Sequence, residues 1–132
     1  MAALLFETKL CTRMHDIDAA GVVFYARYFY FAHNAYEDWL DSRPYTISRI
    51  LDSGRILPIV HTEADFKAPI ALNENIVIKL FLTEKREHSF ALEYQFYNTQ
   101  DELKAVIQTV HVCLDANSRK KISLPSELFT SY

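Results

Sequence analysis

The sequence predicts an α+β fold in which an antiparallel β-sheet wraps around one long central helix. One segment has apolar residues at helical spacing, five others alternate with a period of two, and short polar connections join several of these segments. Short connections favour antiparallel hairpins, because parallel strands need longer crossovers. With 132 residues and only two Gly, the chain is expected to form a single domain over residues 1–132.

The clearest pattern predicts a helix from about Ala26 to about Asp41, ending before Pro44. Its apolar positions follow the spacing i, i+3, i+4, i+7 and onward, at Tyr28, Phe31, Ala32, Ala35, Tyr36, Trp39 and Leu40. This wide aromatic stripe is expected to be covered by the rest of the fold. A short second helix is expected from Thr46, a suitable N-cap, to Gly54, a suitable residue after the C-terminus.

The strands are predicted from the two-residue alternation of apolar and polar side chains. They are Phe6–Met14, Ile56–Phe66, Ile76–Thr83, Phe90–Tyr97 and Val106–Leu114. Pro58 lies near the start of the second strand, where a missing N–H donor is best tolerated. The last strand is apolar on both faces, so it is predicted to be the central one.

Composition and charge exclude several classes of protein. The net charge is −3 and no long basic run exists, which argues against nucleic-acid binding. No apolar stretch approaches the roughly 20 residues that span a bilayer, so no membrane association is expected. Residues 1–6 are too short and lack the basic flank of a secretory signal, so none is expected, and Cys11 and Cys113 show neither metal-type spacing nor a disulfide framework. A cytoplasmic location is therefore expected.

The segment between the first strand and the long helix carries the residues that could do chemistry. Asp18, the turn residue Gly21 and the helix N-terminus fall within about ten residues of one another. Unpaired N–H groups at a helix N-terminus can polarise a carbonyl group, and a nearby carboxylate can attack it or activate water. Together they would form a minimal acyl-transfer site. The residues alone leave an alternative open, in which Asp16 and Asp18 are ordinary loop residues and Gly21 only shapes the turn.

The stretch Asp18–Tyr25, Asp-Ala-Ala-Gly-Val-Val-Phe-Tyr, resembles the Asp-x-x-Gly-[Val/Ile]-Val-[Tyr/Phe/Trp] signature of hotdog-fold thioesterases of the 4-hydroxybenzoyl-CoA thioesterase type. Segments 26–28, 35–40, 57–60 and 64–66 fit the same family, so the resemblance covers nearly the whole chain. It implies a hotdog fold and hydrolysis of an acyl-CoA to a free acid and CoA. It also implies that no metal or redox cofactor takes part, and that sheets join in a homodimer or homotetramer.

The resemblance also implies roles for individual residues. Asp18 matches the catalytic aspartate of the family, acting as nucleophile or as general base. The backbone N–H of Tyr25 matches the group that hydrogen-bonds the thioester carbonyl, and Gly21 matches the glycine that lets the chain pass close to the substrate.

Substrate-binding candidates lie elsewhere in the chain. The hairpin at 86–90 aligns with the family region that contacts the nucleotide end of CoA, which makes Arg86, His88 and Ser89 candidates there. His61, on the second strand, either faces the active cleft or has a structural role.

Two substrate classes compete, and aromatic acyl groups such as hydroxybenzoyl or dihydroxynaphthoyl are favoured. Tyr25 stands where many short-chain members of the family have His. The helix contributes Tyr28, Phe29, Phe31 and Tyr36, whose rings can pack against a substrate ring. The alternatives are a thioesterase for short or medium aliphatic chains and a non-catalytic acyl-CoA-binding module. Asp18 argues against the module, since a binder gains nothing from a carboxylate beside a thioester.

Overall fold

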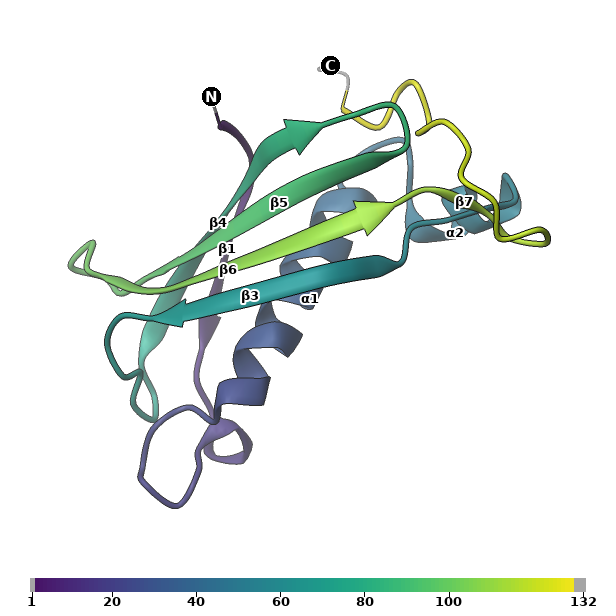
Figure 1. Ribbon diagram of the computed structural model, residues 1–132. Coiled ribbons are helices and arrows are strands. Elements are labelled where there is room, and N and C mark those ends of the chain that lie inside the picture. Colours follow the sequence, from purple (N-terminus) through teal and green to yellow (C-terminus); the bar gives the residue numbers. More distant parts are fainter. Residues whose placement is uncertain (1, 130–132) are drawn as a thin grey trace.

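A computed structural model describes residues 2–129, and Figure 1 shows one antiparallel sheet with the long helix α1 lying along one face. The strand order is β1-β4-β5-β6-β3. The strands are β1 (Ala3–Cys11), β3 (Ile59–Phe66), β4 (Asn75–Lys85), β5 (Ser89–Tyr97) and β6 (Leu103–Val112). The predicted α+β class, with a sheet around one long helix, is confirmed.

The helix α1 (Tyr25–Asp41) buries the aromatic stripe that its spacing predicts. Its buried side chains are Tyr28, Phe31, Ala32, Ala35, Tyr36, Trp39 and Leu40. Trp39 and Leu40 have no exposed surface, and they share a core with inward-facing residues of the sheet such as Leu92 and Phe96. Burying one such side chain contributes roughly 1.5–3 kcal/mol, so this face holds α1 on the sheet. Among residues 2–129, no helix is long and apolar enough to cross a membrane.

Four short elements lie at the ends of the sheet. They are the 3₁₀ turn η1 (Met14–Asp16), the helix α2 (Ile47–Asp52) and the paired strands β2 (Arg55–Ile56) and β7 (Leu114–Asp115). The predicted caps of α2 are present, because Oγ1 of Thr46 accepts the N–H of Arg49 at 3.2 Å. Gly54 follows the helix with φ +80°, a left-handed conformation that glycine adopts without steric cost.

The first strand ends earlier than predicted, at Cys11 rather than Met14. The next residue, Thr12, leaves the sheet and ties the chain to the connection before β4. Its Oγ1 donates to the carbonyl of Ala71 at 2.6 Å and accepts the N–H of Glu74 at 2.9 Å. Met14 lies in η1 and is 77% exposed, so the predicted alternation does not extend to it.

Two other strand predictions need correction. The predicted strand Ile56–Phe66 is divided at Pro58, since β2 pairs with β7 while β3 pairs with β6. The predicted central strand, Val106–Leu114, corresponds to β6 followed by β7, and β6 lies one position from the edge while β5 is central. The side chains of Val106 and Val110, on the face away from α1, are only half-buried, so they do not mark a strand covered on both sides.

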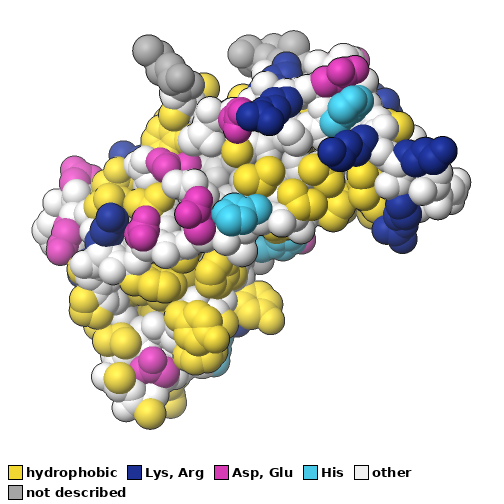
Figure 2. Space-filling model, viewed as in Figure 1, with side chains coloured by type: hydrophobic (Ala, Val, Ile, Leu, Met, Phe, Trp, Pro, Cys, Tyr) yellow, Lys and Arg dark blue, Asp and Glu magenta, His cyan; other side chains and the backbone are white. Residues whose placement is uncertain are grey.

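The edge strand β3 is the most exposed part of the sheet. Ile59, Val60 and Phe66 are 42%, 58% and 49% exposed. Ala64 is half-buried, and every other residue of β3 is exposed. One edge of β3 pairs with β6, and its other edge pairs with no strand of the described chain. In Figure 2, hydrophobic side chains gather on the lower part of the molecule, while Lys and Arg gather toward the α2 and β7 end. An unpaired apolar edge of this kind is suited to pair with another strand.

Candidate active site

The turn between η1 and α1 is held by backbone hydrogen bonds. The N–H of Asp18 donates to the carbonyl of Val22 at 2.9 Å, and the N–H of Gly21 donates to the carbonyl of Asp18 at 3.0 Å. Val23 N–H donates to the carbonyl of Ile70 at 2.8 Å, which fastens the turn to the connection before β4. Gly21 has φ +82°, where any other residue would be strained. The turn therefore holds Asp18 in a defined position.

The carboxylate of Asp18 is held by one oxygen only. Its Oδ1 accepts the N–H of Ala20 at 2.8 Å and that of Val22 at 3.5 Å. Its Oδ2 makes no hydrogen bond to any residue in the described range 2–129. Asp18 lines an open cleft of about 340 Å³, together with Tyr25 and Phe66. The free oxygen is thus available to attack a carbonyl carbon or to take a proton from water.

The N-terminus of α1 opens into the same cleft. The N-cap residue Phe24 has extended dihedral angles of −63° and 135° and offers no side-chain cap. Within residues 2–129, no acceptor is hydrogen-bonded to the N–H of Tyr25 or Ala26. A helix N-terminus carries about half a positive charge, so these groups can polarise a carbonyl and stabilise an oxyanion.

A buried phenol separates the cleft from the core. Tyr28 is 3% exposed and lines the cleft beside Asp18, and its ring meets that of Phe66 edge-on at 4.9 Å. Burial raises the pKa of Tyr28 above its usual 10.0, and the negative charges of Glu74 and Asp18 raise it further. The phenol therefore stays neutral and acts as a wall of the cleft.

Asp16, which the sequence leaves as an ordinary loop residue, is the buried anchor of the turn. It is 2% exposed, and its Oδ2 accepts the N–H of Arg13 at 2.8 Å. Its backbone carbonyl accepts the N–H of Phe24 at 2.9 Å, just before α1 begins. The contact with Arg13 has the three-residue spacing of a capping box, whereas the burial of Asp16 arises only when the turn brings α1 beside it.

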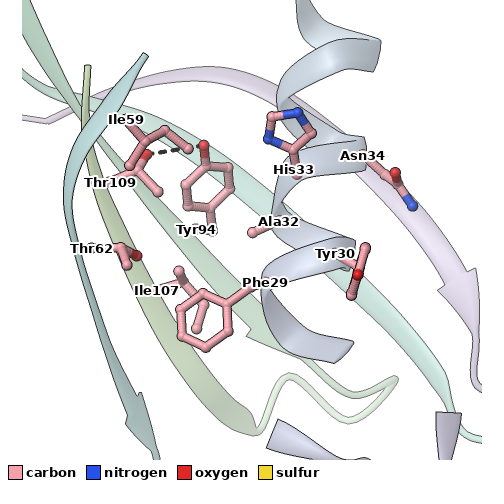
Figure 3. A pocket seen from close by; sticks show the side chains of 10 residues that line it. All are labelled: Phe29, Tyr30, Ala32, His33, Asn34, Ile59, Thr62, Tyr94, Ile107 and Thr109. Atoms are coloured by element: carbon pink, nitrogen blue, oxygen red, sulfur yellow. Dashed lines mark hydrogen bonds between the residues drawn. The ribbon is translucent and has the colours of Figure 1, made fainter. Parts of the chain in front are cut away.

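A second, larger cleft of about 400 Å³ lies between α1 and the strands β3 and β6 (Figure 3). The helix side is formed by Phe29, Ala32 and His33, with Tyr30 and Asn34 at its rim. The sheet side is formed by Ile59, Thr62, Tyr94, Ile107 and Thr109. The walls are mostly apolar, and only a few hydroxyl groups are placed among them. Such a cleft suits a ring or hydrocarbon rather than a charged group.

The predicted CoA-binding residues lie far from Asp18 within one chain. The hairpin with Arg86, His88 and Ser89 joins the end of β4 to the start of β5, whereas the start of β4 pairs with Cys11, near the turn. A strand of 11 residues spans roughly 35 Å, so one chain cannot bring the hairpin to its own Asp18 cleft. The guanidinium of Arg86 forms an ion pair with Glu84 at 2.6 Å.

His61 points away from the clefts. It pairs with Val110 on the face of the sheet opposite α1, while its neighbour Thr62 pairs with the buried Thr109 on the α1 face. The imidazole of His61 is 60% exposed and lies 3.8 Å from Glu63. His61 therefore lies outside the clefts of its own chain, because the register shift between Ile59 and His61 turns its side chain to the outer face.

Solved structures with this arrangement define the class of protein. A 1,4-dihydroxy-2-naphthoyl-CoA thioesterase from Synechocystis matches with a TM-score of 0.85 and 34% identity, covering 91% of this chain and 89% of that one. A gentisyl-coenzyme A thioesterase matches with a TM-score of 0.84 and 26% identity, covering 95% and 100% of the two chains. The chain therefore has the hotdog fold of the thioesterases, as its turn motif predicts.

Residues 12–130 match the Thioesterase-like superfamily, and the chain belongs to this family. A 1,4-dihydroxy-2-naphthoyl-CoA hydrolase from Synechocystis sp. is 36% identical over 112 residues, which are 83% of this chain and 81% of the relative. The hydrolase of that name from Synechococcus elongatus is 34% identical over 125 residues, covering 93% and 91%. The prediction of a thioester-hydrolysing enzyme is confirmed at this level.

Proposed function

We propose that the protein hydrolyses an aromatic acyl-CoA, with 1,4-dihydroxy-2-naphthoyl-CoA as the first candidate substrate. The observation that carries the proposal is the free Oδ2 of Asp18 in one cleft with the unpaired N–H of Tyr25. The relatives named for this substrate, at 32–36% identity, support the choice of acyl group. The mostly apolar cleft beside α1, with Phe29 in its wall, has a shape and chemistry suited to a ring.

In the proposed reaction, the thioester carbonyl accepts a hydrogen bond from the N–H of Tyr25 at the N-terminus of α1. Asp18 Oδ2 takes a proton from a water molecule that attacks the carbonyl carbon, or it attacks that carbon itself and water later splits the anhydride. The negative charge that develops on the carbonyl oxygen is stabilised by the helix N-terminus. The C–S bond then breaks, and CoA leaves as a thiolate that takes up a proton.

The proposed enzyme is a homodimer or homotetramer in which two β3 edges pair. A two-fold axis across antiparallel edges reverses the second sheet, so the β4–β5 hairpin end of one copy approaches the turn of the other. In this arrangement Arg86, His88 and Ser89 would contact the nucleotide end of a CoA bound at the Asp18 of a second copy. The exposed apolar residues of β3 and the length of β4 support this reading.

We also propose a cytoplasmic location. It rests on the two free cysteines, Cys11 and Cys113, which form no disulfide in the described chain.

A thiol-release assay over a panel of acyl-CoAs tests the function. We expect kcat/KM for 1,4-dihydroxy-2-naphthoyl-CoA or 4-hydroxybenzoyl-CoA to exceed that for hexanoyl-CoA at least about tenfold, a difference of about 1.4 kcal/mol in transition-state binding. Equal or faster hydrolysis of straight-chain substrates would make the enzyme an aliphatic acyl-CoA thioesterase. Binding of acyl-CoA without any release of thiol would make it a binding module.

A further inference from the structure

The polar side chains at the bottom of the second cleft form a chain of hydrogen bonds. The hydroxyl of Tyr94 lies 3.1 Å from Oγ1 of Thr109, the contact drawn as a dashed line in Figure 3. Oγ1 of Thr109 lies 2.9 Å from Nε2 of His111, and Nδ1 of His111 lies 3.3 Å from the carbonyl oxygen of Leu57. Tyr94, Thr109 and His111 are all at least 95% buried.

The direction of each hydrogen bond follows from the last acceptor. The carbonyl of Leu57 can only accept, so Nδ1 of His111 carries the proton. Burial lowers the pKa of His111 to about 4, so the neutral ring has no second proton, and Nε2 accepts from Thr109. Thr109 has then used its only proton, so its oxygen accepts from Tyr94. The hydroxyl protons of Tyr94 and Thr109 and the Nδ1 proton of His111 are therefore all donated to acceptors within the protein.

The sheet side of the cleft is left with acceptors alone. The hydroxyl oxygen of Tyr94 keeps lone pairs that no described residue of 2–129 hydrogen-bonds. Thr62 repeats the arrangement, because its hydroxyl donates to the carbonyl of Gln108 at 2.8 Å and its oxygen lines the cleft. On the helix side, His33 also lines the cleft, and its Nε2 lies 3.3 Å from a carboxylate oxygen of Glu37. The neighbouring sheet residues Ile59 and Ile107 are apolar.

Both clefts lie between α1 and β3, the Asp18 cleft at the N-terminus of α1 and the second cleft further along the helix. Phe29 follows Tyr25 by one helical turn, about 6 Å along α1. Thr62 and Phe66 are on the same face of β3, about 13 Å apart. An acyl ring whose carbonyl is bound at the N–H of Tyr25 would extend along α1 toward Phe29 and the acceptors.

We infer that the second cleft is a specificity pocket for an acyl ring that carries hydroxyl groups, with the oxygens of Tyr94 and Thr62 as the acceptors. The inference rests on the proposed function, since it takes this cleft as the acyl site. A ring hydroxyl gives the buried oxygen of Tyr94 the donor that it lacks, and a second one can donate to the exposed oxygen of Thr62. An unsubstituted ring leaves the oxygen of Tyr94 unpaired, and a ring that bears carbonyl oxygens places one acceptor against another.

The test compares kcat/KM for 1,4-dihydroxy-2-naphthoyl-CoA with that for 2-naphthoyl-CoA, under reducing conditions. We expect a ratio of about ten or more in the wild type, because a site built for a hydroxyl rejects the analogue without it. Tyr94→Phe should lower this ratio at least about fivefold, because the ring hydroxyl loses its acceptor and the unsubstituted ring no longer leaves a buried oxygen unpaired. Tyr97→Phe is the matched control, since Tyr97 points to the other face and donates to Gln95 at 2.6 Å.

A second pair of variants tests the direction of the hydrogen bonds between Tyr94, Thr109 and His111. Thr109→Val removes the acceptor of the Tyr94 proton, which frees that proton to point into the cleft, so the ratio should fall. Thr109→Ser keeps the hydroxyl and should keep the ratio. Thermal unfolding of each variant checks that the fold survives, so that a fall in the ratio reports on the pocket.

The outcomes separate this inference from the proposed function. If the wild type hydrolyses both substrates equally, or if Tyr94→Phe leaves the ratio unchanged, the inference is overturned while the thioesterase stands. If neither thioester is hydrolysed, the proposed function fails. The pocket is then tested by calorimetry with 1,4-dihydroxy-2-naphthoate and 2-naphthoate, where about tenfold tighter binding of the dihydroxy acid supports the inference and equal affinity overturns it.

Discussion

Nε of Arg27, in the first turns of α1, donates a hydrogen bond to Oδ1 of Asp16 at 2.8 Å. The carboxylate of Asp16 is 3% exposed and both of its oxygens have partners, whereas Asp18, two residues later, has one free oxygen in a cleft. The two carboxylates of one turn are therefore expected to divide between structure and chemistry, and the first two predictions test this division.

Asp18→Asn should leave the protein folded and lower turnover by at least about a hundredfold, the usual scale for loss of a general base or nucleophile. The amide keeps an oxygen that can accept the N–H of Ala20, so the turn survives. Steady-state kinetics and circular dichroism on the purified variant measure the two effects. Near-normal hydrolysis by folded Asp18→Asn would remove Asp18 from the catalytic role.

Asp16→Asn should show the reverse behaviour. It removes the buried charge that pairs with Arg27. Because the side chain of Arg27 is 29% exposed, solvent partly screens this ion pair, and we expect a loss of about 2 kcal/mol in unfolding free energy. For a chain of this size the midpoint of thermal unfolding should fall by roughly 5–10 °C. The folded variant should keep turnover within about threefold of the wild type. A stable but inactive Asp16→Asn would assign the chemistry to Asp16 instead.

Tyr25 should act through its backbone. Its ring is 61% exposed, so Tyr25→Phe should keep most of the activity. Tyr25→Pro deletes the N–H at the first position of α1, where proline is tolerated, and should abolish turnover without unfolding the protein. Both variants are compared by thiol release and by CoA binding. A dead Tyr25→Phe variant that still binds CoA would show that the hydroxyl takes part in the chemistry.

The protein should have the mass of two or more chains of 15.4 kDa in light scattering, because the β3 edge is apolar and unpaired. Val60→Lys places a charge on this edge and should shift the protein toward single chains with lower activity. Leu51→Lys, at a similarly exposed apolar residue of α2, is the control and should leave the mass unchanged. A fully active wild-type particle of one chain would contradict the paired sheets.

His111 should make stability depend on pH between about 7 and 4. Burial lowers its folded pKa from 6.5 to about 4, so below about pH 6.5 the unfolded chain binds a proton that the folded one does not. Stability is therefore greatest above pH 6.5 and falls by about 3 kcal/mol as pH decreases toward 4. Urea unfolding of the wild type and His111→Gln should show the steeper fall in the wild type. His61→Gln, at an exposed histidine of β3, is the control; parallel curves for wild type and His111→Gln would refute the assignment.

The sequence predicted those parts of the fold that depend on local spacing. The stripe from Tyr28 to Leu40 needs only the helical period, and the caps of α2 at Thr46 and Gly54 need only local chemistry. The turn around Asp18 carries a local motif of the same kind. Each of these could be located because the physical signal lies within a dozen residues.

What depends on pairing between distant segments could not be predicted in the same way. The position of β6 beside the edge follows from β3 pairing with it, 46 residues away at Thr62 and Gln108. His61 faces outward because a register shift lies between Ile59 and His61, which no composition rule reveals. The burial of Asp16 likewise depends on where the turn places Arg27.

The strand order also determines the sequence in which the fold can assemble during synthesis. β4, β5 and β6 pair with their neighbours in the chain, but β1 must wait for β4 and β3 must wait for β6. The aromatic face of α1 therefore leaves the ribosome before any of the three strands that form the middle of its cover. Until residue 112 has emerged, Trp39 and its neighbours lack most of that cover, and the nascent chain depends on slow, long-range pairing to bury them.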